Sequence, residues 1–284
     1  MSITFSNLVT QQAAWNLSAA NARLGESILR LSSGLKVQYP QDGTFEYIRA
    51  SSLQHNVRLY EGVRSNLSEY RSILSLANDA GAEIRKKLET MREKAIAASD
   101  PTMGASERSA LFTEFNTLRD TIDKIVKSTK YEGGGILYEA GKYNQVNNIS
   151  VIPDRSVTMT LDLDKMDVSD SGVDGIVIDD TAWPSDIEAG TSSVEVSTAI
   201  NTVDTFMAEV SGSLEQVQGH IRMADSMIQN FSAARSSLIE IDVAEEMANF
   251  TSLDVKKQAA QAVFAQANLS QRSILRLYEF SYSG

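Results

Sequence analysis

Residues that could perform chemistry are few in this chain and do not gather into a recognisable site. Gly133-Gly134-Gly135 lacks the following Gly-Lys-Ser/Thr sequence of a phosphate-binding loop, and we interpret it as the end of a helix. Asp162 begins an aspartate-rich stretch without the glycine and ligand spacing of an EF-hand loop. Solvated turns are the favoured interpretation of that stretch, and calcium binding is the alternative. The stretch continues with Asp164, Asp167, Asp170 and Asp174.

Metal-dependent and nucleophilic chemistry also lack their usual residues. The chain has no cysteine, which excludes disulfides and thiolate ligands, and its two histidines, His55 and His220, are not part of a metal-binding spacing. No His-Glu-x-x-His or Gly-x-Ser-x-Gly sequence occurs. We therefore predict no catalytic residue, no cofactor and no metal site, and a protein that is not an enzyme.

Composition narrows the possible partners. The formal net charge of −11 argues against nucleic acid, because phosphate binding needs a concentrated cationic surface. No stretch approaches the roughly 20 apolar residues of a membrane span, and the first residues lack the pattern of a secretory signal. We expect no membrane insertion, and any export would use another route.

The elements that must organise such a chain are long helices. From Leu53 to Ala98, uncharged residues recur at alternating spacings of three and four, which predicts one helix of roughly 70 Å. The same spacing runs from Leu111 to Thr129, after a break at 99–104, and again from Val203 to Leu238. These patterns predict a mainly α, elongated coiled-coil bundle. The expected rod core is Leu67, Leu74, Ile84, Leu88, Leu118, Ile122, Val210, Leu214, Val217, Ile221 and Ile228.

Both ends of the chain carry amphipathic helical patterns that need partners. We expect the N- and C-terminal helices to pair side by side and to leave apolar surface for a further helix or subunit. The residues expected to mediate this association are Leu24, Ile28, Leu31, Leu35, Leu253, Val263, Ala267, Ile274 and Leu277.

The region between the helical segments is different in kind. From Ser156 to Leu163, apolar and polar residues alternate with the period of a half-buried strand. Further strand candidates are 149–152 and 175–178. We expect a β-hairpin or small sheet there.

Motifs near both ends resemble those of bacterial flagellins. The C-terminal signature of that family is similar to Ser232-Ala233-Ala234-Arg235-Ser236, to residues 239–248 and to Phe264-Ala265-Gln266-Ala267-Asn268. Arg30-Leu31-Ser32-Ser33-Gly34-Leu35 is similar to the N-terminal signature. The stretch from Tyr39 to Tyr47 departs from the Asp-Asp-Ala-Ala-Gly-like sequence that usually follows.

The resemblance implies a short flagellin without the large outer domains that many members insert. It divides the chain into a tube helix at 1–38, a connector at 39–52, rod helices at 53–130, a β-hairpin region at 131–190, a rod helix at 191–238 and a second tube helix at 239–284.

The function that the resemblance implies is structural: a subunit that polymerises into the flagellar filament used for motility. Its partners would be further copies of itself, the flagellar export apparatus and export chaperone, and the hook–filament junction and cap proteins. Its location would be the extracellular filament, or the periplasm in a spirochaete. A hook–filament junction adaptor is the main alternative, although 243–247 and 265–268 favour the filament subunit. An exported enzyme on a flagellin scaffold and a cytosolic helical adaptor are less favoured.

The resemblance also bears on recognition by hosts. Flagellins detected by the vertebrate flagellin-sensing Toll-like receptor carry a stretch similar to Leu-Gln-Arg-x-Arg-Glu-Leu, which aligns with Leu88 to Lys94. Thr90 replaces an arginine of that stretch, and Lys94 replaces its last leucine. The resemblance therefore implies a poor receptor agonist, with neutral surface changes as the alternative.

Overall fold

A computed structural model describes residues 5–137, 145–163, 178 and 182–282 of the chain. Contacts between residues divide the protein into two compact units. The terminal unit comprises Met1–His55 and Phe231–Gly284, and the central unit comprises Asn56–Asn230. Each unit therefore joins segments from both halves of the sequence.

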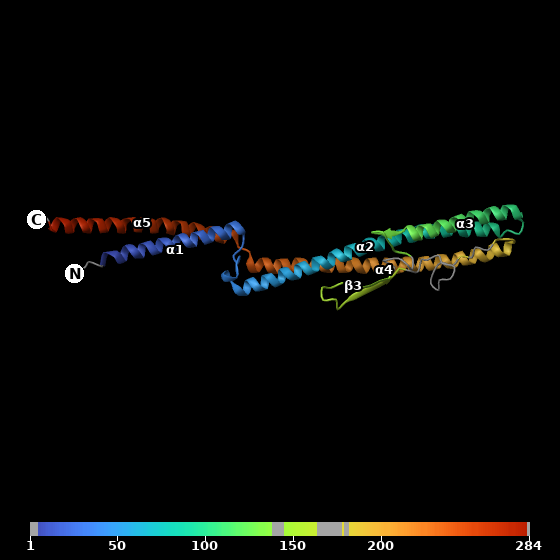
Figure 1. Cartoon of the computed structure of the whole chain (residues 1–284), viewed down its shortest axis with the longest axis horizontal. Coiled ribbons are helices and arrows are strands. Elements are labelled where there is room, and N and C mark those ends of the chain that lie inside the picture. Colours follow the sequence, from blue (N-terminus) through green and yellow to red (C-terminus); the bar gives the residue numbers. More distant parts are fainter. Residues whose placement is uncertain (1–4, 138–144, 164–177, 179–181, 283–284) are drawn as a thin grey trace. The chain divides into compact units, whose positions relative to one another are not determined.

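The mainly α-helical fold expected from the sequence is confirmed. The helices that the structure describes are α1 (Phe5–Ser33), α2 (Thr44–Ala98), α3 (Ala105–Ser128), α4 (Asp186–Ile239) and α5 (Val243–Tyr282), as Figure 1 shows. Helix α2 begins within the segment expected as a connector, and α4 begins within the segment expected as the β region. The break between the first two rod helices falls at 99–104, as predicted.

The core of the central unit follows the three-four spacing of α2. From Val63 to Ala98, every residue at that spacing is buried, and Ile73 and Ala80 widen the buried stripe by one neighbouring position each. Gly81 marks a close approach of another helix, because a Cβ at that position would lie 3.1 Å from the Met207 side chain of α4. A stripe this regular is what a helix needs to pack along its whole length against partners.

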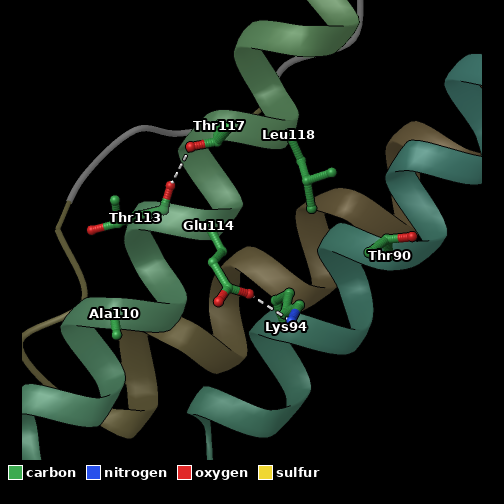
Figure 2. A pocket seen from close by; sticks show the side chains of 7 residues that line it. All are labelled: Thr90, Lys94, Ala110, Thr113, Glu114, Thr117 and Leu118. Atoms are coloured by element: carbon green, nitrogen blue, oxygen red, sulfur yellow. Dashed lines mark hydrogen bonds and ion pairs between the residues drawn. The ribbon is translucent and has the colours of Figure 1, made fainter.

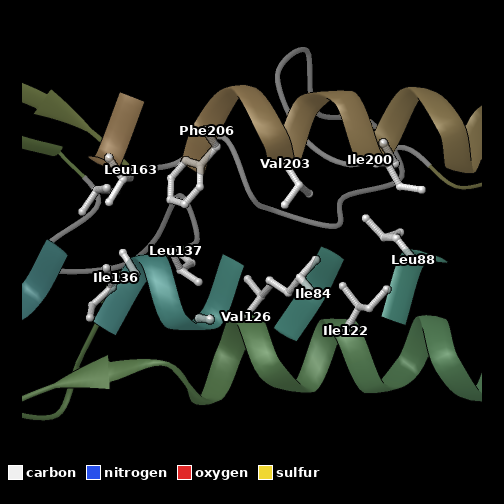
Figure 3. Packing of buried hydrophobic residues seen from close by; sticks show 14 of the residues in the cluster. Ile84, Leu88, Ile122, Val126, Ile136, Leu137, Leu163, Ile200, Val203 and Phe206 are labelled. Atoms are coloured by element: carbon white, nitrogen blue, oxygen red, sulfur yellow. The ribbon is translucent and has the colours of Figure 1, made fainter. Parts of the chain in front are cut away.

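Figure 3 shows that α2 lies between two helices in this core, with side chains of α3 and α4 directed toward it. Ile122 and Val126 come from α3, and Val203 and Phe206 from α4; all four are almost completely buried. Residues outside the helices join the same cluster, among them Ile136, Leu137 and Leu163.

One buried arginine holds the turn between α2 and α3 together. The Arg108 side chain is 7% exposed, and its guanidinium donates hydrogen bonds to the carbonyl oxygens of Ala98, Asp100 and Met103 at 2.9, 3.2 and 3.3 Å. Hydrogen bonds from the hydroxyl and the backbone N–H of Thr102 lower the pKa of the Asp100 carboxyl. Carbonyls at the end of α2, which have no partner inside the helix, thus gain a charged donor.

Two antiparallel hairpins follow α3. Strands β1 (Lys130–Tyr131) and β2 (Gly134–Gly135) flank a tight turn in which Glu132 and Gly133 both have positive φ. The glycine run therefore forms a hairpin, while the helix itself ends earlier, at Ser128.

The longer hairpin pairs β3 (Gln145–Ser150) with β4 (Thr158–Asp162), with an irregularity between Val146 and Ile149. The expected β-hairpin is therefore confirmed. The further strand candidate at 175–178 lies outside the described residues except for Ile178, which is buried.

An aromatic cluster ahead of α4 adds to the packing of the central unit. Trp183 is buried and meets the rings of Phe112 and Phe115 of α3 edge to face, at centroid distances of 5.2 and 4.7 Å. Its Nε1–H donates a hydrogen bond to the Ser192 hydroxyl at 2.9 Å. The segment before α4 is thereby fixed to α3.

Candidate functional site

The terminal unit is built on the pairing of α1 with α5, which lie side by side in Figure 1. Ala13, Leu24 and Ser27 of α1 and Leu253 of α5 are buried. Because these helices come from opposite ends of the sequence, the expected pairing of the terminal helices is confirmed.

A short β-bridge joins the chain where it leaves and re-enters this helix pair. Leu35 pairs with Glu240, the Lys36 N–H donates to the Ile239 oxygen at 2.7 Å, and the Ile241 N–H donates to the Gly34 oxygen at 3.0 Å. Gly34 has a φ of 71°, a left-handed conformation that glycine adopts without strain. The sequence Ser-Ser-Gly thus ends α1 and turns the chain into the bridge.

The first turn of α5 is capped by a side chain. Asp242 accepts hydrogen bonds from the backbone N–H groups of Ala244 and Glu245, at 2.9 and 3.3 Å. Asp is a preferred N-cap, and its negative charge is favourable at the positive end of a helix. The start of α5 is therefore defined by local sequence.

The helix pair leaves many large apolar side chains in solvent. Trp15 is 70% exposed, Val263 59% and Ile28 49%. Isolated exposed apolar residues are common on proteins, but a set of this size on one pair of helices indicates an association surface. The further exposed residues of this set are Leu29, Val243, Met247, Val255 and Leu269.

The structure brings some of the predicted association residues inside the terminal unit and leaves others outside it. Leu24 and Leu253 are buried, Leu31, Leu35 and Ala267 are partly buried, and Ile28 and Val263 are exposed. The side chains of Ile274 and Leu277 lie outside the described part. The role of all these residues in association stays a prediction. Substitutions at exposed Ile28 and Val263 test it most directly.

The predicted rod-core residues all lie in the central unit. Those that are almost completely buried are Leu67, Leu74, Ile84, Leu88, Ile122, Val210 and Val217. Those that are partly buried are Leu118, Leu214, Ile221 and Ile228.

The divergent segment after α1 forms an ordered turn. Pro40–Asp42 is a 3₁₀ helix, and the Asp42 carboxylate accepts the backbone N–H groups of Gln38 and Tyr39 at 3.0 and 2.8 Å. Val37 and Ala50 on either side of this turn pack with Ile239 in a small buried cluster. The unusual sequence is therefore compatible with a defined connection into α2.

Figure 2 shows a groove between α2 and α3 in the central unit. Lys94 and Glu114 face each other across it, with 2.6 Å between Lys94 Nζ and Glu114 Oε2. Thr90, one turn from Lys94 on α2, lines the same groove, together with Leu118 of α3. Two of the positions at which this chain departs from receptor-detected flagellins thus lie on one surface.

Several residues that shape these features were not singled out in the sequence. Arg108 had no recognisable pattern, because it acts through contacts specific to the turn between α2 and α3. Ser27 and Glu246 form a partly buried polar contact between α1 and α5, and nothing in either helix alone marks them as partners.

Among the described residues, no group of three or more His, Asp or Glu side chains is placed to hold a metal ion. None of the helices that the structure describes is both long and apolar enough to cross a membrane. What the site can do is associate through apolar helix surfaces.

Comparisons with known proteins identify the family of both helical regions. Residues 5–141 match the bacterial flagellin N-terminal helical region, and residues 194–278 match the C-terminal helical region. Flagellin FljM of Caulobacter vibrioides is 26% identical, covering 94% of each chain, and the flagellin of Halalkalibacterium halodurans is 27% identical, covering 95% of this chain and 97% of its own.

Among solved structures, the crystal structure of Bacillus cereus flagellin is similar, with a TM-score of 0.49 and 23% identity, over 60% of this chain and 94% of that one. The two helical regions account for most of the sequence, and the named relatives extend over nearly all of it. The chain therefore belongs to the bacterial flagellin family.

Proposed function

We propose that this chain is a structural subunit that polymerises with further copies of itself into the bacterial flagellar filament used for motility. The observation that carries the proposal is the set of exposed apolar side chains on paired helices α1 and α5. Each large apolar side chain that becomes fully buried contributes about 1.5–3 kcal/mol. In a helical polymer every subunit has several neighbours, so many modest contacts accumulate.

The finer parts of the proposal follow from family membership. The protein acts without catalysis or cofactor and without nucleic acid. It is secreted through the flagellar export apparatus with an export chaperone, and it contacts hook–filament junction and cap proteins. The filament is extracellular, or periplasmic if the source is a spirochaete. The adaptor function at the hook–filament junction is not better supported.

We assign the six segments of the chain accordingly. Residues 1–38 and 239–284 form the inner tube, 39–52 connect it to the rod, and 53–130 with 191–238 form the rod beside the β-hairpin region at 131–190. The pairing of α1 with α5 supports the first of these assignments.

Seeded polymerisation followed by electron microscopy tests the function. The full chain should extend filament seeds, and a chain lacking Leu253–Gly284 should not, although circular dichroism should show that its central unit still melts cooperatively. The reason is that the core of the central unit is satisfied within 56–230, while α1 loses its partner. Long filaments from the truncated chain would contradict the proposal.

A single substitution gives a sharper version of this test. Val263→Asp should lower the seeded growth rate at least tenfold, because burying a carboxylate against a neighbouring subunit costs well over 1.4 kcal/mol. Gln261→Asp, at an exposed polar position of the same helix, is the matched control and should grow nearly normally. Equal growth of the two variants would remove Val263 from the association surface.

A further inference from the structure

The α1 face from Ala13 to Leu31 contains one polar side chain among apolar ones. Over this stretch the residues at three-four spacing face α5, and all of them except Ser27 are apolar; partly buried Thr10 continues the same spacing toward the N-terminus. Ser27 is 2% exposed, less than either of the buried apolar residues nearby. The other members of this face are Ala13, Leu17, Ala20, Leu24 and Leu31.

The partner of Ser27 is a carboxylate on the facing helix. The Ser27 hydroxyl donates a hydrogen bond to Glu246 Oε1, and the Asn249 amide donates to the same oxygen at 3.3 Å. Glu246 is partly buried and precedes Phe250 and Leu253 at the same spacing along α5. Its position in the first turn of α5 makes the charge less costly, because the helix dipole is positive there.

Apolar side chains alone do not define how two such helices align. A slip of seven residues along α1 brings residues of similar size against α5, because Leu17, Leu24 and Leu31 recur at that interval, as do Ala13 and Ala20, so packing changes little. The polar contact between the helices is lost, because Ser27 would have no partner in the interface and Glu246 would keep only the Asn249 amide of its own helix. An unpaired buried hydroxyl or carboxylate costs about 1–3 kcal/mol or more.

We propose that the Ser27–Glu246 hydrogen bond fixes the register of α1 against α5. Which exposed apolar residues of α1 lie beside which residues of α5 depends on this register. Its consequence for polymerisation rests on the proposed function, since a subunit in a shifted register presents a different composite surface to its neighbours. The register itself does not depend on that function.

Distance measurement between spin labels in the full chain tests the register. The sequence has no cysteine, so cysteines placed at exposed Asn16 of α1 and Gln261 of α5 are the only labelling sites. The labelled chain should give one narrow distance peak. Ser27→Ala, and Ser27→Ala combined with Glu246→Leu, should each add a second peak, displaced by at most about 10 Å, the length of seven helical residues.

Two comparisons separate register from simple stability. Ser27→Thr keeps the hydroxyl and should keep the single peak, as should Ser18→Ala at an exposed position of α1. The double variant should retain its helical circular dichroism, because apolar side chains can replace a buried polar pair without loss of stability. A stable double variant with one unchanged peak would overturn the proposal, and so would a second peak in Ser18→Ala.

The same samples separate this proposal from the proposed function. If the unsubstituted chain shows one peak but does not extend seeds, the filament function fails and the register assignment stands. If the double variant shows two peaks and extends seeds at the normal rate, the register assignment stands and its consequence for polymerisation is wrong.

Discussion

Lys94 illustrates how a single side chain changes the character of a surface. Its ammonium lies 2.6 Å from the Glu114 carboxylate across the groove between α2 and α3, and both side chains are partly exposed. An exposed pair of this kind contributes at most about 1 kcal/mol to stability. Its effect is therefore on what can bind, because a hydrated ion pair lies at the position where the resemblance implies a leucine in receptor-detected flagellins.

We predict that Thr90→Arg combined with Lys94→Leu raises the potency of the monomer toward the flagellin-sensing Toll-like receptor. The arginine adds several hydrogen-bond donors, and the leucine removes an ammonium that is costly to desolvate. One additional buried contact with the receptor should improve the free energy of binding by about 2 kcal/mol, or roughly thirtyfold in affinity.

A receptor reporter-cell titration measures this change. Arg58→Leu, an exposed substitution elsewhere on α2, is the control and should leave potency unchanged. Potency of the unsubstituted chain equal to that of an ordinary filament subunit would show that the two differences are neutral.

At the residue scale, sequence reasoning is least informative where a polar group is buried. Ser27 and Glu246 are 219 residues apart, so no local pattern connects them. In the sequence, Arg108 does not differ from other helical arginines. Only the fold of the turn before α3 places three carbonyl oxygens within hydrogen-bond distance of it. Their contribution depends on tertiary contacts that spacing alone does not specify.

Helix α2 is the element that the sequence predicts best. Its three-four spacing is encoded locally, and the burial from Val63 to Ala98 follows it without exception. Helix α5 is harder, because apolar residues also lie directly beside the expected positions, as Ala259 does beside Ala260 and Phe264 beside Val263. The structure buries part of Phe264 and exposes Val263, a distinction that only the position of α1 decides.

The turn between α2 and α3 supports a stability prediction. Arg108→Met should lower the free energy of unfolding of the central unit by about 2–3 kcal/mol, because it removes the charged donor and leaves carbonyl groups of the turn unpaired. Urea unfolding followed by circular dichroism measures the change.

Lys124→Met provides the comparison for this turn. Lys124 is exposed on α3, and its replacement should change the free energy by less than about 0.5 kcal/mol. If both variants unfolded at the same urea concentration, the Arg108 hydrogen bonds would have no net effect on stability.

Across the whole molecule, charge is divided unevenly. Residues 1–55 and 231–284 hold nine basic and nine acidic side chains, so the formal net charge of −11 belongs entirely to residues 56–230. The terminal unit, which carries the exposed apolar helices, is formally neutral. Repulsion between subunits therefore arises from the central units.

We predict that seeded growth is faster in about 150 mM salt than in about 10 mM salt, because the Debye length falls from roughly 30 to 8 Å. Replacing exposed Glu61 and Glu215 by Gln should weaken this dependence. Turbidity or microscopy of seeded samples gives the rates. Identical rates at the two salt concentrations would mean that the central-unit charges point away from neighbouring subunits.

The pairing of α1 with α5 also determines when the terminal unit can form. Helix α1 is synthesised before α2, α3 and α4, and its partner α5 follows all three, so α1 has no partner until those helices have been made. Helices α2 and α3, joined by a short turn, can meet early, since nearby segments close at little entropic cost. Growing chains and chains cut short at the C-terminus therefore lack the finished helix pair. Such chains therefore lack the surface that we propose for polymerisation, and only chains that include α5 can join a filament through it.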